Sequence, residues 1–353
     1  MRLLALDLGP AMRGGQRQTA LVLAGLAARG HAVRLLARRG APLAAARPAG
    51  VEIAEVPAGS DASPALLLAV AREARTFRAE IVYAGDARGH GAAVFSRAAG
   101  DVPLVVHRRV IFSPGRGPLS RLKYRAPALY LAVSGAVRES LERAGVPAEK
   151  VVAVPDGLPD EAFLENTAPA PPPIRLVHAG AFDGRKGQRV VVDTLARLVA
   201  GGLDATALFL GDGPLRKAVE AQSVARGVAE RCLFAGHVED VATRLAASHV
   251  MLFPSESEGG PLALVEAMAA GCLAVGHDVG GASEMVQGGA AGVLVASLDA
   301  EAWERAVLAL LHDPARRAGL IAAGRAAARE RTIARTVAGV EAGLEKARGG
   351  RGA

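Results

Sequence analysis

Short apolar runs recur along the chain at a spacing that leaves room for a helix between most of them. In the first half, the runs cover residues 3–8, 31–37, 51–56, 81–84, 104–107, 129–133 and 151–154. In the second half, they cover residues 174–178, 205–210, 231–234, 250–253, 273–276 and 292–295. Helical stretches lie between several of them, notably at residues 19–28, 66–77 and 135–144. This alternation predicts parallel sheets covered by helices.

A proline-rich segment interrupts the pattern near the middle of the chain. Residues 167–173 read Thr-Ala-Pro-Ala-Pro-Pro-Pro, and proline has no N–H to donate to a sheet. At 353 residues the chain is also long for a single core. We expect two doubly wound Rossmann-like domains, of residues 1–165 and 166–331, and then a C-terminal helix and tail over residues 332–353. Ligands of such sheets bind at the carboxyl ends of the strands, which places the expected site in a cleft between the domains.

Composition narrows the class of partner. The formal net charge is +7, and such a basic excess suits a nucleic acid, an anionic membrane surface or a phosphorylated substrate. No aromatic-plus-basic motif favours a nucleic acid, so we expect none as a partner. The two cysteines, Cys232 and Cys272, form no metal or redox pattern, which favours a reducing cytosol. No run reaches the roughly 18 apolar residues of a membrane helix, so we expect a cytoplasmic protein that meets a membrane only from the side.

One stretch carries the most chemistry. Phe253-Pro-Ser-Glu-Ser-Glu-Gly-Gly-Pro-Leu-Ala-Leu-Val-Glu266 is typical of a strand, a turn and a helix, with Pro261 at the first helical position. Two carboxylates, Glu258 and Glu266, bracket the start of that helix. Because helical side chains lean toward the N-terminus, both can flank the unpaired N–H groups there. An anion site between two hydroxyl-binding carboxylates suggests a sugar nucleotide.

These residues resemble the signature of the family 4 retaining glycosyltransferases (group 1 glycosyltransferases). Further landmarks of that family follow in order: Gly14-Gly-Gln-Arg-Gln18, Arg29-Gly-His-Ala-Val33, Val133-Ser-Gly-Ala-Val-Arg138, Gly211-Asp-Gly-Pro214 and Phe234-Ala-Gly-His-Val238. The stretch Val106-His-Arg-Arg-Val-Ile-Phe112 resembles a subset that acts on lipopolysaccharide and other cell-envelope sugars. The resemblance covers nearly the whole chain and implies the GT-B fold, in which two Rossmann-like domains face a cleft.

The resemblance implies a set of donor-binding residues. Glu258 would hold the hydroxyls of the donor sugar, Glu266 the ribose hydroxyls, and Lys186 the donor phosphates, with Lys186 and Glu258 taking part in catalysis. The other donor-binding positions are Gly14, Gly15, Arg185, Gly236, Val238, Gly259, Gly260 and Leu262. Taken singly, each has a plain alternative: a solvent-facing charge or an ordinary turn. Two positions depart from the family, since Ala181 stands where an arginine is common and Gly260 where an aromatic residue is common.

The acceptor side is expected in the first half of the chain. His107 ends a strand, and the resemblance implies a catalytic histidine in this region near the reacting sugar; a strand-end histidine bonded to backbone is the alternative. Asp86, Arg108 and Arg109 are the other candidates. The densest basic stretch adds Arg116, Arg121, Lys123 and Arg125, interleaved with Phe112, Leu119, Leu122 and Tyr124. Such a stretch suits an anionic lipid surface or a phosphorylated saccharide, or else is a solvated face.

Missing motifs complete the expectation. There is no Asp-x-Asp tripeptide and no His/Cys cluster with zinc spacing, so we expect no metal and no cofactor. The sequence therefore predicts a metal-independent, retaining glycosyltransferase that moves a sugar from a nucleoside-diphosphate sugar to a cell-envelope glycan or a lipid-linked acceptor. Two alternatives stay open: a degenerate GT-B protein that binds a nucleotide sugar or a partner without catalysis, and a nucleotide-sugar epimerase on the same fold.

Overall fold

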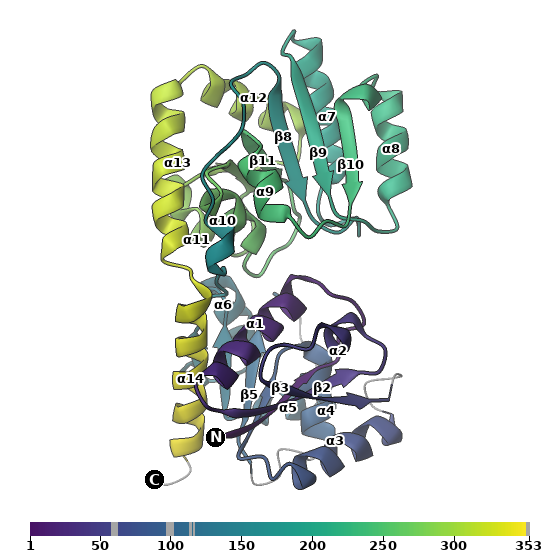
Figure 1. The fold of residues 1–353 in the computed structure, drawn as a ribbon, viewed down its shortest axis with the longest axis vertical. Coiled ribbons are helices and arrows are strands. Elements are labelled where there is room, and N and C mark those ends of the chain that lie inside the picture. Colours follow the sequence, from purple (N-terminus) through teal and green to yellow (C-terminus); the bar gives the residue numbers. More distant parts are fainter. Residues whose placement is uncertain (58–62, 97–101, 113–114, 116, 351–353) are drawn as a thin grey trace. The chain divides into compact units, whose positions relative to one another are not determined.

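Each of the apolar runs named above is a β-strand in the computed structural model, which describes residues 1–57, 63–96, 102–112, 115 and 117–350. The chain divides into two units, one of Met1–Gly157 with Ile333–Ala353 and one of Leu158–Thr332. Each unit is built on one parallel sheet, so the expected pair of Rossmann-like domains is confirmed (Figure 1). No helix in the described part of the chain is long and apolar enough to cross a membrane.

The sheet of unit 1 has the strand order β3-β2-β1-β4-β5-β6-β7. Its strands are β1 (Arg2–Asp7), β2 (Ala32–Arg38), β3 (Val51–Val56), β4 (Ile81–Ala84), β5 (Leu104–Arg108), β6 (Leu129–Ala132) and β7 (Val151–Ala153). Its helices are α1 (Gly14–Ala28), α2 (Pro42–Ala46), α3 (Pro64–Thr76), α4 (Ala87–Phe95), α5 (Pro118–Arg125), α6 (Gly135–Arg143), the short η1 (Ala148–Lys150) and α14 (Ile333–Gly349).

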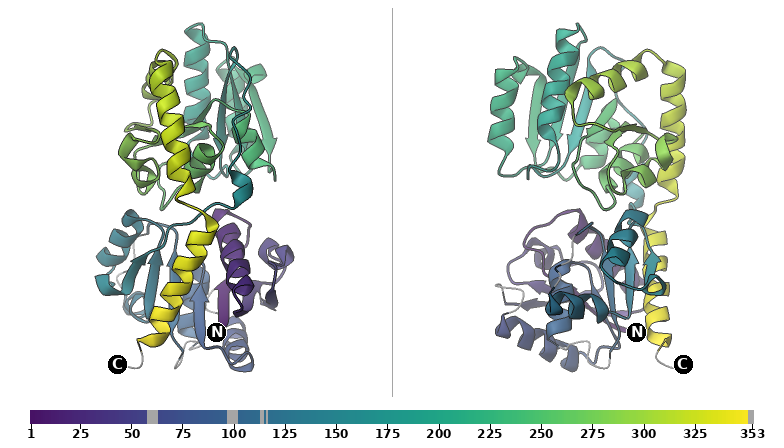
Figure 2. Two further views of the ribbon diagram at one scale, coloured as in Figure 1. Left: turned by 60° about the vertical axis from the view of Figure 1, so that its left-hand side comes forward. Right: turned by 180° about the vertical axis from the view of Figure 1, so that it is seen from behind.

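Successive residues of the unit 1 strands fill two separate cores, because side chains alternate between the faces of a sheet. Leu4 and Leu6 of β1 pack in one cluster with α3, α4 and α6. Leu3 and Ala5 pack in another with α1, α2 and α14. Figure 2 shows α14, in yellow, alongside the purple α1. The helix that ends the chain is therefore part of unit 1 and covers one face of its sheet.

The sheet of unit 2 has the strand order β10-β9-β8-β11-β12-β13. Its strands are β8 (Ile174–Ala179), β9 (Ala205–Leu210), β10 (Cys232–Gly236), β11 (Val250–Phe253), β12 (Leu273–His277) and β13 (Val293–Val295). Its helices are α7 (Gln188–Ala200), α8 (Arg216–Ala225), α9 (Val241–Ala246), α10 (Leu262–Ala269), α11 (Ala282–Met285), α12 (Ala300–Leu311) and α13 (Pro314–Arg329), with the short η2 (Asp160–Ala162), η3 (Ala229–Arg231) and η4 (Gln287–Gly289). One core lies under α9, α10 and α13, and the other under α7 and α12.

Along the chain, the first boundary between the units lies between residues 157 and 158, ahead of the boundary after residue 165 that the sequence suggested. Leu158 already belongs to unit 2, since its N–H donates to the carbonyl of Arg331 at 2.8 Å. Asn166 then ties the proline-rich segment to unit 2 through hydrogen bonds from its Nδ2 to the carbonyls of Ser248 (3.1 Å) and Gly271 (3.0 Å). The prolines therefore follow the surface of unit 2, and the chain has crossed between the units before it reaches them.

Candidate functional site

The strand order of unit 2 reverses between β8 and β11, and a crevice at the carboxyl ends of such strands is where doubly wound sheets hold ligands. The loop after β8 carries Arg185 and Lys186, and the loop after β11 carries Glu258. The residues that the sequence predicted for the donor phosphates and the donor sugar therefore emerge from the two strands that flank this point.

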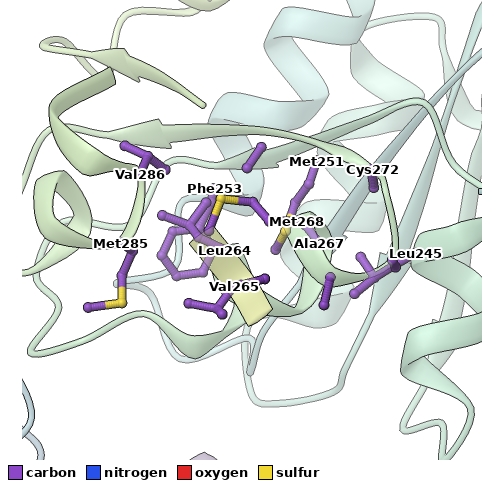
Figure 3. Packing of buried hydrophobic residues seen from close by; sticks show 14 of the residues in the cluster. Leu245, Met251, Phe253, Leu264, Val265, Ala267, Met268, Cys272, Met285 and Val286 are labelled. Carbon is purple, nitrogen blue, oxygen red and sulfur yellow. The ribbon is translucent and has the colours of Figure 1, made fainter. Parts of the chain in front are cut away.

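Helix α10 follows the second of these loops and is fixed by its packing. Leu264, Val265 and Met268 are buried against Met251 and Phe253 of β11 (Figure 3). The helix begins at Leu262, with Pro261 at the preceding, extended cap position. Its first N–H groups lie just after Gly259 and Gly260 in the chain, and Glu266 follows one turn into the helix. This is a helix start that can accept an anion.

Lys186 and Glu258 form an ion pair at the site. Lys186 Nζ lies 2.5 Å from Glu258 Oε1, and the Lys186 and Glu258 side chains are 26% and 12% exposed. Ser255 Oγ lies 2.6 Å from the same carboxylate oxygen. The ammonium also lies 5.6 Å from the centre of the Phe253 ring. A partly exposed cation thus stands beside a partly exposed carboxylate, an arrangement that can receive a diphosphate and a polyol together.

Backbone contacts join the loop after β8 to the loop after β11. The carbonyl of Arg185 accepts hydrogen bonds from Glu256 N (2.8 Å), with Ser255 Oγ at 3.1 Å. Gly187 has a positive φ of 72°, and a Cβ there would lie 2.0 Å from the carbonyl oxygen of Pro254. Only glycine fits such an approach. The side chain of Arg185 is exposed, so its backbone, rather than its guanidinium, builds the site.

The neighbouring strands end in a second pair of joined turns. Gly211 N donates to the carbonyl of Gly236 at 2.7 Å, and a Cβ on Gly211 would lie 2.2 Å from the Gly180 carbonyl oxygen. Arg216 supports the turn by donating to the carbonyl of Phe234 at 3.0 Å. Val238 packs on the core beneath α10. The predicted base-binding positions therefore lie on the same edge of the sheet as Lys186, two strands away from β8.

In unit 1, the predicted glycine loop begins a helix. Gly14 and Gly15 are the first two residues of α1, whereas we expected the helix from residue 19. Neither has a positive φ, and a Cβ on Gly14 would meet nothing within 4 Å. The local geometry therefore does not require glycine at residue 14.

The acceptor-side candidates around His107 are buried and bonded to one another. His107 is 1% exposed; its Nε2 lies 3.2 Å from the Val154 carbonyl and its Nδ1 lies 2.9 Å from the Tyr83 hydroxyl. Burial, followed by the charge of Arg109, holds the pKa of His107 well below its usual range. Arg109 Nε donates to both carboxylate oxygens of Asp156 at 3.0 Å. The imidazole is therefore neutral, with its proton on Nε2, and the surroundings match the backbone-bonded alternative.

Arg108 and Asp86 are also held by the protein. Arg108 is 5% exposed, with its guanidinium 4.0 Å from the centre of the Phe112 ring. Asp86 caps helix α4, where its Oδ1 accepts from Gly89 N (2.7 Å) and Leu8 N (3.2 Å). Burial, and then the charge of Asp7, raise the pKa of Asp86 to about 6. Asp86 lies at the point where the strand order of unit 1 reverses, and it is half-buried.

The basic stretch divides into buried and exposed parts, and Arg116 lies outside the described residues. Arg121 and Arg125 of α5 are exposed, as are Leu119 (68%) and Leu122 (54%). Lys123 instead donates to the carbonyl of Ala87 at 2.8 Å. Helix α5 thus rests on α4 by one side and presents a mixed apolar and basic side to solvent.

Sequence reasoning did not single out Ser255, His277, Asp7 or Asp156. Ser255 stands three residues before Glu258, a spacing that could have indicated a contact with it. Asp156 is 47 residues from Arg109 along the chain, and no local pattern joins them. Among the described residues, no group of three or more His, Cys, Asp or Glu side chains could hold a metal ion.

Comparisons with known proteins agree with this architecture. A family model described as glycosyltransferase family 4 matches residues 12–162, and one described as glycosyl transferases group 1 matches residues 173–313. The α-D-kanosaminyltransferase of Streptomyces kanamyceticus is 27% identical over 282 residues, which is 70% of this chain and 73% of that protein. A lipopolysaccharide core biosynthesis mannosyltransferase of Rhizobium leguminosarum is 36% identical over 97 residues, 28% of each chain.

A solved structure shows the same fold. The crystal structure of Anabaena HepE in complex with UDP matches with a TM-score of 0.84 and 19% identity, over 98% of this chain and 100% of that one. The two family models fall one on each half of the chain and together span most of it. The protein is therefore a glycosyltransferase of GT-B fold and belongs to the family 4, group 1 glycosyltransferases.

Proposed function

We propose that this glycosyltransferase moves a sugar from a nucleoside-diphosphate sugar to a cell-envelope glycan or lipid-linked acceptor, with retention of configuration at the sugar. The observation that carries the proposal is the Lys186–Glu258 pair at the strand-order reversal of unit 2, beside the start of α10. A structural neighbour, HepE, has been crystallised with UDP, which supports a nucleotide donor. A relative named as a lipopolysaccharide core mannosyltransferase supports an envelope acceptor.

The donor would occupy the site through opposite charges. The diphosphate would bind the Lys186 ammonium and the first N–H groups of α10. Glu258 would accept hydrogen bonds from the sugar hydroxyls, and Glu266 from the ribose hydroxyls. The turns at Gly236 and Val238 would hold the base. Each group on the protein then faces the part of the donor that it complements.

The transfer itself would need electrostatic support more than a protein nucleophile. The bond between the anomeric carbon and the diphosphate oxygen breaks, the oxygen of the acceptor hydroxyl bonds to the same face of the sugar, and the proton of that hydroxyl passes to the departing diphosphate. Negative charge grows on the leaving diphosphate, where Lys186 and the α10 amides can stabilise it. Because these groups supply the positive charge, we propose that the reaction proceeds without a metal.

Donor binding and turnover test the proposal separately. Thermal unfolding would be followed with UDP, GDP and ADP and their glucose and mannose conjugates, since a ligand that binds the native state raises Tm. Product formation would then be measured with the stabilising donor and a lipid-linked or oligosaccharide acceptor. Lys186→Ala and Glu258→Ala should each lower kcat by about 100-fold or more. Lys217→Ala, which removes an exposed lysine of α8, serves as the control. Near-normal turnover in either site variant would show that the assignment is wrong.

A binding protein without catalysis is the second candidate, and Ala181 favours it. Position 181 offers no cation beside Lys186, and its carbonyl accepts instead from Gln188 Nε2 at 3.0 Å. This candidate predicts that the donor raises Tm but is not consumed with any acceptor. Consumption of the donor only when an acceptor is present would favour the transferase.

We also propose that α5 places the protein at the anionic inner face of the cytoplasmic membrane. Leu119 and Leu122 are exposed on one side of the helix, and Arg121 and Arg125 are exposed beside them. An apolar face with flanking cations suits anionic headgroups. Sedimentation with phosphatidylglycerol vesicles should fall when both leucines are changed to serine, and high salt should weaken it. Leu68→Ser, at an exposed leucine of α3, is the matched control. No binding at low salt would end the idea.

A further inference from the structure

The two oxygens of the Glu258 carboxylate have different surroundings. Oε1 lies 2.5 Å from Lys186 Nζ and 2.6 Å from Ser255 Oγ. Oε2 has no hydrogen-bond partner in the described part of the chain. One oxygen is therefore held by the protein, and the other is left to accept a hydrogen bond from a ligand.

Ser255 lies in the interior of unit 2 and contacts the Glu258 carboxylate from the protein side. Its relative exposure is 0%, so it cannot contact a substrate itself. Its Oγ lies near two acceptors: Glu258 Oε1 at 2.6 Å and the Arg185 carbonyl at 3.1 Å. A hydroxyl has one proton, and the short contact to the charged oxygen takes it. Ser255 thus donates to Oε1.

The backbone of Ser255 is fixed by a neighbouring strand. His277, the last residue of β12, has its Nδ1 2.8 Å from the carbonyl oxygen of Ser255. A carbonyl only accepts, so Nδ1 carries the proton. The N–H of Glu256 is held in turn by the carbonyl of Arg185 at 2.8 Å. The hydroxyl of Ser255 is thereby aimed by groups from the ends of β8, β11 and β12.

We infer that Ser255 is a positioning residue for the donor sugar, which keeps Glu258 oriented once Lys186 has turned to the diphosphate. This rests on the proposed function, in which Lys186 binds the donor phosphates. When the ammonium moves to the phosphates, Oε1 loses its charged partner. The Ser255 hydroxyl is then the side-chain donor that still holds Oε1, so that Oε2 continues to face the sugar. Ser255 should accordingly matter for the sugar of the donor and not for its nucleotide.

Titration calorimetry with a nucleotide and its sugar conjugate tests this split. In Ser255→Ala, the affinity for UDP or GDP, whichever the protein binds, should stay within about twofold. The affinity for the matching diphosphate sugar should fall about tenfold or more, because a hydrogen bond to a charged group is lost. Ser255→Cys keeps the volume with a weaker donor and should show a similar loss. Ser248→Ala is the control, since that buried hydroxyl in the same unit donates only to the carbonyl of Arg244, at 2.8 Å.

A double-mutant cycle with Glu258→Gln asks whether Ser255 acts through Glu258. Ser255→Ala should cause little further loss of sugar affinity in the Glu258→Gln background. Additive losses, or equal losses for nucleotide and nucleotide sugar, would overturn the inference. If the unaltered protein binds the nucleotide and the nucleotide sugar, and Ser255→Ala binds each of them as tightly as the unaltered protein does, only this inference fails. If the unaltered protein binds neither ligand, the proposed function fails and this inference fails with it.

Discussion

Replacing Asp86 by Asn is expected to stabilise unit 1 above pH 6. Burial, and then the nearby Asp7 carboxylate, raise the pKa of Asp86 from 3.8 to about 6. The folded state therefore holds this proton more tightly than the unfolded state. The stabilisation is complete below about pH 4 and is lost as the pH rises through 6. Asparagine is neutral throughout, and it can still accept the hydrogen bonds from Leu8 N and Gly89 N that cap α4.

The size of the effect follows from the pKa. A change of about two pKa units corresponds to about 3 kcal/mol at 1.36 kcal/mol each, and this is an upper bound. We expect Asp86→Asn to be about 1–3 kcal/mol more stable than the unaltered protein at pH 8, and about equal to it at pH 4.

Urea unfolding between pH 4 and pH 8 measures this difference. All three tyrosines, Tyr83, Tyr124 and Tyr130, lie in unit 1, and the single tryptophan, Trp303, lies in unit 2. Tyrosine absorbance and tryptophan fluorescence therefore report the two units separately. Asp313→Asn is the control, because Asp313 caps α13 from an exposed position. The reasoning would be refuted by an Asp86→Asn variant whose stability follows the same pH dependence as the unaltered protein, or that is weaker at pH 8.

Two further outcomes follow from packing. Gly25→Ala should destabilise unit 1 by about 1–3 kcal/mol, because the added Cβ would lie 2.5 Å from Val337 of α14. A Cβ on Gly14 would meet nothing within 4 Å, so Gly14→Ala should be neutral or slightly stabilising. Equal effects of the two variants in urea unfolding would contradict this expectation. Cys272 is 1% exposed, and burial raises the pKa of its thiol. A thiol reagent at pH 7.5 should therefore modify Cys272 slowly until urea unfolds the chain. Rapid modification of Cys272 in the folded protein would contradict this expectation.

The sheets could be predicted because their signal is local. The central strands, such as β1, β4, β5, β6 and β11, read as short apolar runs because helices cover both faces of each sheet. Helix starts are harder to predict: Gly14 and Gly15 indicate a loop in the sequence, but they are the first two residues of α1. The pairing of Lys186 with Glu258 depends on strand order, which the periodicity of the chain does not contain.

Burial of the acceptor-side candidates could not be predicted for the same reason. His107 and Arg109 stand at the end of β5, a position that often faces a ligand. His107 is instead buried, and Arg109 pairs with Asp156, which follows the end of β7. A charged residue at the end of a strand therefore looks like a ligand-binding residue in the sequence, because the residue that pairs with it in the fold is far away along the chain. Lys186 and Glu258 are partly exposed and pair with each other, and Ser255 also contacts Glu258.

The assignment of α14 to unit 1 makes unit 2 an insertion within unit 1. The chain crosses between the units twice, near residues 157 and 333, and a chain cut at the first crossing would leave the Val337, Val340 and Leu344 side of the core uncovered. Arg2 and Arg348 both contact Glu80, which accepts from Arg2 N at 2.6 Å and lies 3.9 Å from the Arg348 guanidinium. A circular permutant that joins the two ends of the chain and opens between residues 157 and 158 would turn the nested units into two consecutive ones, each encoded by an unbroken stretch of sequence.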